Sequence, residues 1–205
     1  MLGMRVLIVG ESHYREPARP ESESLTVDVC EDWLESPDPH FQIPIIAAIT
    51  GNANPSSDEC RRLWRSIAFY NYVRHPMPDA GTRPKDDEFD HTALDAFREV
   101  LKRLRPACVL LFSMNVYNYM PCDYDRSDPA AAEALDWHST GGRPMRGMNG
   151  AQLGWFDTNE GEQAFLLPMS HPNRWKYDGT APVDWHPFIR KAVDYARART
   201  FDAGA

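Results

Sequence analysis

The stretch Met4-Arg-Val-Leu-Ile-Val-Gly-Glu-Ser-His-Tyr14 decides how the rest of the chain is interpreted. Within it, Val6 to Val9 form a short aliphatic run rich in β-branched residues, which is typical of a strand buried on both faces. Gly10 ends the run and allows a sharp turn or a close approach to the backbone. The next side chains are all polar: Glu11, Ser12, His13 and Tyr14. Open α/β sheets bind ligands at the carboxyl ends of such strands, so we expect a functional site here. An ordinary exit from strand to loop is the alternative for this stretch alone.

The length and composition predict one domain that spans residues 1–205. The chain has 205 residues, 42% of them hydrophobic, which is enough for one packed core. No apolar run approaches the roughly 20 residues of a membrane helix, and we expect no signal peptide. The four cysteines include no C-x-x-C pair, so we expect no zinc ribbon and no iron–sulfur cluster. We also expect no other metal and no cofactor. Cysteines of this kind also favour the reducing cytoplasm.

The formal net charge of -8 makes a nucleic-acid partner less expected, because phosphate binding depends on Lys and Arg. Net charge does not exclude a local basic patch, however. Two polar stretches near the expected site carry basic side chains: Arg143, Arg146, Arg174 and Lys176. These four residues predict a basic rim that can contact the phosphates of DNA. The sequence leaves open whether that DNA is single-stranded, double-stranded or modified. The sequence leaves the oligomeric state open.

Further buried strands are predicted at 66–73, 108–112 and 163–167, the last paired in a hairpin with 152–156. Amphipathic stretches between them predict helices, the clearest of which is capped by Thr92 and stopped by Pro106. A last helix is expected to be capped by Asp184. Strands separated by helices predict an α/β protein: a three-layer α/β/α sandwich with a central, mostly parallel sheet of about four strands.

The ends of these strands carry polar side chains that should meet. Asn71 lies at the end of the second strand, Ser113 and Asn115 follow the third, and His171 follows the last. Because the carboxyl ends of parallel strands lie on one edge of a sheet, we expect Glu11, Tyr14, Asn71 and His171 to line one pocket.

Three motifs in this order resemble the uracil-DNA glycosylase superfamily: Gly-Glu-Ser-His-Tyr after the first strand, Phe-Tyr-Asn-Tyr-Val-Arg in the second, and Ser-His-Pro-Asn after the last. The resemblance covers about residues 4–195. It implies a hydrolase that flips a base out of DNA and cleaves its N-glycosidic bond. It would make Tyr14 the gate of the pocket, Asn71 the reader of the base edge, and His171 the group that stabilises the departing base. Trp175 would be the side chain that wedges into the duplex.

The chain also departs from the family pattern. Ser12 stands where many members have aspartate, His13 replaces proline, and the carboxylate is Glu11, one residue earlier. Asn173 and Arg174 replace the serine and proline that usually follow the His-Pro pair. We therefore expect an unusual or modified, uracil-like base as the substrate. The expected catalytic residues are His171, Glu11 and Ser12, and the expected base-binding residues are Asn71, Tyr14 and His13.

The chemistry fits these residue types without reference to the family. Cleavage of an N-glycosidic bond places negative charge on the base, which a histidine can stabilise, and positive charge on the sugar, which a carboxylate can stabilise while it orients water. Two other functions stay open. A non-catalytic nucleobase or nucleic-acid binding module is favoured by Ser12, and an enzyme acting on free nucleosides or nucleotides is favoured by the acidic charge.

Individual residues have simpler interpretations as well. Trp175 can pack in the core instead of contacting DNA. A metal held by Glu11, His13 and His171 lacks the spacing of two histidines on one helix. Ser12 as a nucleophile lacks the Gly-x-Ser-x-Gly elbow.

Overall fold

A computed structural model describes residues 3–15, 22, 24–79, 82–119, 128–137, 153–159 and 162–202. Within these ranges the chain forms a five-stranded sheet with the order β2-β1-β3-β5-β4. The strands are β1 (Val6–Gly10), β2 (Ala68–Asn71), β3 (Cys108–Leu111), β4 (Gly154–Asn159) and β5 (Glu162–Pro168). Strands β2, β1, β3 and β5 pair in parallel, and β4 pairs antiparallel with β5 at one edge.

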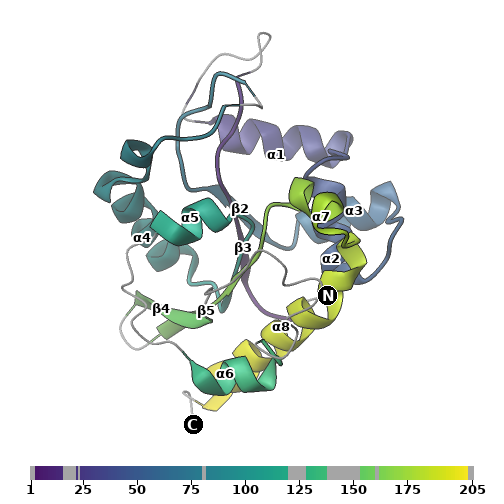
Figure 1. The fold of residues 1–205 in the computed structure, drawn as a ribbon, viewed down its shortest axis with the longest axis vertical. Helices are drawn as coiled ribbons and strands as arrows, with labels where there is room; N and C mark the ends of the chain where they lie inside the picture. The colour runs from purple at the N-terminus through teal and green to yellow at the C-terminus, as the bar shows by residue number, and fades with distance from the viewer. Residues whose placement is uncertain are drawn as a thin grey trace.

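Helices cover both faces of this sheet (Figure 1). One face packs against α2 (Gln42–Thr50), α3 (Ser57–Trp64), α6 (Pro129–Ala134), α7 (Pro172–Asp178) and α8 (His186–Asp202). The other face packs against α4 (His91–Leu104) and α5 (Met114–Tyr119). Helix α1 (Leu25–Glu35) lies beside α3 and β2, and the short 3-10 helices are η1 (Asp86–Phe89) and η2 (Pro182–Trp185). The predicted α/β/α sandwich is confirmed, with the antiparallel β4 as an additional edge strand.

Strand β1 is central because its side chains serve both layers. Val6 and Ile8 belong to the core under α2, α3 and α8, whereas Leu7 and Val9 belong to the core under α4. Every residue of the strand is buried. A strand buried on both faces cannot alternate polar and apolar residues, which explains the continuous run in the sequence.

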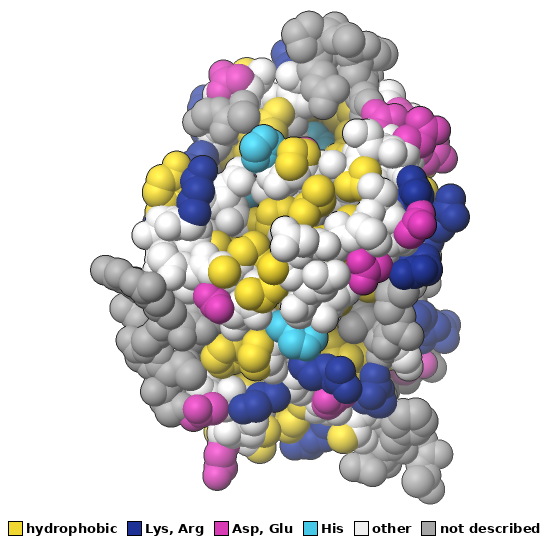
Figure 2. All heavy atoms as spheres, turned by 90° about the vertical axis from the view of Figure 1, so that its right-hand side faces the viewer, with side chains coloured by type: hydrophobic (Ala, Val, Ile, Leu, Met, Phe, Trp, Pro, Cys, Tyr) yellow, Lys and Arg dark blue, Asp and Glu magenta, His cyan; other side chains and the backbone are white. Residues whose placement is uncertain are grey.

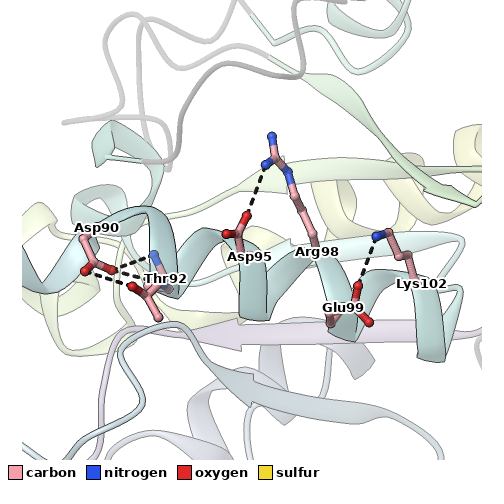
Figure 3. A network of polar contacts seen from close by, with 7 residues as sticks. Asp90, Thr92, Asp95, Arg98, Glu99 and Lys102 are labelled. Carbon is pink, nitrogen blue, oxygen red and sulfur yellow. Dashed lines mark hydrogen bonds and ion pairs between the residues drawn. The ribbon is translucent and has the colours of Figure 1, made fainter.

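Helix α4 shows where sequence reasoning misplaced a cap. The N-cap is Asp90, whose Oδ1 accepts hydrogen bonds from the backbone N–H groups of Thr92 at 2.8 Å and Ala93 at 3.1 Å (Figure 3). Thr92, the predicted cap, lies inside the first turn. Both residue types cap helices well, so the sequence offers two starting points that are two residues apart.

The final helix also begins later than predicted. Asp184 lies in η2, where its Oδ2 accepts the backbone N–H of Ala181 at 2.7 Å, and α8 starts at His186.

Within the described ranges, none of the helices has both the length and the apolar character needed to cross a membrane.

Candidate functional site

The site is built around the last residue pair of β1 and β2, in which Gly10 lies opposite Asn71. Asn71 is buried with only 5% of its surface exposed. A Cβ atom added at Gly10 would lie 2.3 Å from Asn71 Oδ1 and 3.4 Å from the Phe69 ring. The missing side chain of Gly10 therefore provides the space in which the Asn71 amide lies at the carboxyl edge of the sheet.

Aromatic rings connect this position to the end of β5. Phe69 lies two residues before Asn71, so the two side chains share one face of the sheet. The Phe69 ring is 5.7 Å from that of Phe41, which in turn is 5.4 Å from the ring of His171. Asp38 Oδ1 accepts the backbone N–H of Phe41 and so fixes the turn that precedes α2. Asn71 and His171 consequently lie on the same side of the sheet.

His171 forms the N-cap of α7, and this contact selects its tautomer. The backbone N–H of Asn173 donates to His171 Nδ1 at 3.2 Å. Burial, together with the nearby charge of Arg83, lowers the pKa of His171 from 6.5 to about 4. The ring is therefore neutral at neutral pH, and because Nδ1 accepts a hydrogen bond its proton resides on Nε2. A neutral N–H donor of this kind can stabilise negative charge that develops on a ligand oxygen.

Glu11 provides the carboxylate of the site. Its backbone oxygen accepts the N–H of Val73, so the pairing of β1 with β2 continues one residue past Gly10. Its side-chain Oε2 accepts the hydroxyl of Ser113 at 2.6 Å. The ends of β1 and β3 are therefore joined by a side-chain hydrogen bond.

Tyr14 lies on the segment that follows, which is attached to the chain after β2. The backbone N–H of Met77 donates to His13 O at 2.8 Å, and that of Arg15 donates to Met77 O at 2.7 Å. Tyr14 is 42% exposed, and burial of the rest of its side chain and the charge of Glu11 raise the pKa of its hydroxyl, against an opposing effect of Arg83. The Tyr14 hydroxyl is therefore protonated at neutral pH, and its role as the gate of a pocket stays a prediction.

His13 and Ser12 are half-buried in the same loop. His13 Nε2 lies 2.9 Å from Thr26 Oγ1 in α1, and its ring packs edge-on to Phe69 at 6.3 Å. His13 therefore joins the aromatic cluster from the side of α1. Figure 2 draws the side of the molecule that lies on the right in Figure 1. In the upper half of that view, histidine side chains lie at the surface among hydrophobic side chains.

The structure corrects the interpretation of Trp175. This side chain is 1% exposed, donates its Nε1–H to Ser170 O at 3.1 Å, and packs against Trp185. It lies in the core because the short helix α7 needs an apolar anchor, so it does not project toward a duplex. The exposed aromatic side chain of α7 is instead Tyr177, which is 77% exposed, with Lys176 Nζ 4.9 Å from the centre of its ring.

The predicted basic residues are described only in part. Arg174 and Lys176 are exposed on α7, directly after His171. Arg143 and Arg146 lie outside the described residues. The basic rim is consequently represented by α7 alone, with Tyr177 beside it.

The sequence did not single out several residues that the fold brings to this edge. Arg83 acts electrostatically on both Tyr14 and His171. Phe41 and Phe69 form the aromatic connection between the end of β2 and His171. The sequence signal for Phe69 was its place two residues before Asn71, which puts both side chains on one face of the strand. The hydroxyl of Ser170, which is 6% exposed, has no hydrogen-bond partner in the described structure. It directly precedes His171 in the sequence.

In the part of the chain that the structure describes, no three His, Cys, Asp or Glu side chains form a group that could hold a metal ion. The thiols of Cys30, Cys60 and Cys108 are free, and burial raises the pKa of Cys108 to about 12. Cys108 is a core residue of β3, as its apolar neighbours predicted.

Comparison with known proteins gives no further assignment. No protein-family model matches the chain, and no curated protein matches its sequence. The chemistry of this molecule therefore has to be inferred from the side chains that meet at the carboxyl edge of its sheet.

Proposed function

We propose that the chain is a DNA glycosylase-like hydrolase that flips an unusual or modified, uracil-like base into a pocket and cleaves its N-glycosidic bond. The observation that carries the proposal is the position of Asn71 and His171 on one side of the sheet, connected by the contacts of Phe69 and Phe41. The Asn71 amide offers one donor and one acceptor edge to a pyrimidine-like base. Aromatic rings beside it offer surfaces on which a flipped base can stack.

In the proposed reaction, the bond between C1′ of the sugar and the base nitrogen breaks, and its electron pair moves onto the base. His171 donates its Nε2–H to the base oxygen that gains negative charge. Glu11 orients a water molecule and takes its proton as the water oxygen bonds to C1′. The departing base then takes up a proton from solvent. Ser12 remains a candidate for a contact to this water because it lies in the same loop as Glu11.

The proposed partner is DNA, bound through phosphate contacts at α7. Arg174 and Lys176 supply positive charge, and Tyr177 supplies an exposed ring beside it.

We infer a reducing cytoplasm from the free thiols of Cys30, Cys60 and Cys108.

A second candidate is an enzyme that acts on free nucleosides or nucleotides. The formal net charge of -8 favours it, because a small substrate needs no extended basic surface. The same pocket residues would then bind the base, and α7 would make no contact with the substrate.

The test is an abasic-site cleavage assay across a panel of single- and double-stranded oligonucleotides that carry modified bases. We expect the parent protein to release one class of uracil-like base and His171→Gln to release it more slowly while binding is retained. A gel shift at several salt concentrations accompanies the assay. Base release only from free nucleosides would support the second candidate, and binding without release would support a non-catalytic module.

A further inference from the structure

Glu11 is held through its backbone and through its side chain. Its backbone is fixed by the Val73 N–H, and the preceding Gly10 O accepts the N–H of Tyr72. The side chain of Glu11 is the part that the backbone contacts leave free to rotate. Its Oε2 accepts a hydrogen bond from the Ser113 hydroxyl, with 2.6 Å between the two oxygens. This distance is in the range of hydrogen bonds between a hydroxyl and an ionised carboxylate.

Ser113 is itself immobilised. It follows β3, is 1% exposed, and its Oγ accepts the backbone N–H of Val116 in the first turn of α5 at 3.2 Å. A serine hydroxyl has a single proton. Because the oxygen already accepts from Val116, that proton can point at Glu11, and the rotation of the hydroxyl is restricted.

We propose that Ser113 is a positioning residue for the reaction, which holds one carboxylate oxygen of Glu11 so that the other is presented to the attacking water. The inference rests on the proposed function, since it assigns Glu11 the role of the water-orienting base. A general base acts only within hydrogen-bond reach of the proton that it abstracts. A side chain with several rotatable bonds reaches that geometry more often when one of its oxygens is fixed.

A purely structural role for the same hydrogen bond makes a different prediction. The bond would then only join β1 to α5, and its loss would lower stability without a specific effect on the chemical step. Thr158 provides a matched control, because it is also 1% exposed and its hydroxyl donates to Glu162 O at 3.2 Å, at the opposite edge of the sheet.

The experiment measures single-turnover base release from the oligonucleotide that the panel identifies. It also measures binding to an oligonucleotide with a tetrahydrofuran abasic residue. Ser113→Ala should slow release roughly 10- to 100-fold, the range that a hydrogen bond to a charged group supports, with unchanged binding. Ser113→Thr should retain most of the rate. Thr158→Val should be less stable but release base at the parental rate. In a Glu11→Gln background, Ser113→Ala should slow release little further, because Ser113 acts through Glu11.

Folding of each variant is checked by circular dichroism, and Ser113→Cys, which keeps the volume with a weak donor, replaces Ser113→Ala if the alanine variant does not fold. A parental rate in Ser113→Ala, or in Ser113→Cys where that variant replaces it, would overturn the inference and leave the proposed function standing. Equal losses in binding and rate would overturn it in favour of a structural or binding role. Absence of base release by the parent on every oligonucleotide would overturn the proposed function, and the inference with it.

Discussion

The side-chain oxygen of Asn71 occupies space that any side chain on Gly10 would need, since a Cβ atom there would lie 2.3 Å away. The two residues are opposite each other where β1 and β2 end. A glycine at this position is therefore a requirement of the asparagine beside it.

Gly10→Ala tests this relationship. We expect it to displace the Asn71 amide, to lower the free energy of unfolding by about 1–3 kcal/mol, as overpacking does, and to abolish discrimination between bases. Urea denaturation measures the first effect. The double variant Gly10→Ala with Asn71→Ala should recover stability relative to the sum of the single variants. Additive losses would show that Asn71 is not the group that Gly10 accommodates.

His171 should make stability depend on pH. Its pKa is about 4 in the folded chain and 6.5 when exposed, so the unfolded state binds more protons between these values. This contribution is present above pH 6.5 and is lost as the pH falls toward 4, by roughly 3 kcal/mol at most. Urea unfolding of the parent and of His171→Gln at pH 7 and pH 4.5 measures it. The parent should lose more stability than the variant, and an equal loss would contradict a buried, neutral histidine.

The exposed face of α7 should govern affinity for DNA. Arg174→Ala and Lys176→Ala should each weaken binding and reduce the salt slope by close to one unit. Tyr177→Ala should cost roughly 1–3 kcal/mol of binding free energy with little change in slope, as loss of a stacked ring does. Lys102→Ala on α4 is the control. Lys102 forms an ion pair with Glu99 (Figure 3), and α4 packs on the face of the sheet opposite to that of α7. Fluorescence anisotropy at several salt concentrations gives both quantities, and equal effects of Lys102→Ala would argue against an interface at α7.

Trp175→Ala should act on folding. The ring is 1% exposed and packs against Phe112 and Trp185, so its removal should cost about 3–5 kcal/mol. Thermal unfolding of this variant beside Tyr177→Ala distinguishes a core residue from a surface residue. A stable Trp175→Ala protein with weakened DNA binding would restore the interpretation of Trp175 as a wedge.

The hydroxyls of Ser170 and Thr180 should respond in opposite ways to removal. Both residues are 6% exposed, but Thr180 Oγ1 donates to Trp175 O at 3.1 Å, whereas Ser170 Oγ has no partner in the described structure. Thr180→Val should lower the free energy of unfolding by about 1 kcal/mol, and Ser170→Ala should leave it unchanged or raise it. A similar loss in both variants would mean that Ser170 is already satisfied in the free protein.

The sequence predicted the parts of the fold that depend on local pattern. Buried strands separated by helices predicted the mostly parallel sheet and one shared carboxyl edge, where the structure pairs Gly10 with Asn71. Trp175 was misplaced because a single short motif does not reveal which side of a seven-residue helix faces the core. Arg83 carried no signal at all. Its charge acts on Tyr14 and His171, which are far from it in the sequence, and no periodicity reveals such a relationship.

The hydrogen bond between Ser113 and Glu11 could not be predicted either, although both residues were expected at strand ends. They are 102 positions apart in the sequence, and their contact depends on the register of β1 against β3. A strand pattern gives the face on which a residue lies but not the partner that it meets.

The central claim is that these side chains cleave the bond between a base and its sugar. Intact-mass spectrometry of an oligonucleotide after incubation with the protein tests it most directly, with His171→Gln and Glu11→Gln as comparisons. We predict that the strand loses one base, which is replaced by a hydroxyl group, that the free base appears in equal amount, and that both variants form the products more slowly. Strand masses that stay unchanged for every base tested, or a changed base that remains attached to its sugar, would contradict the account.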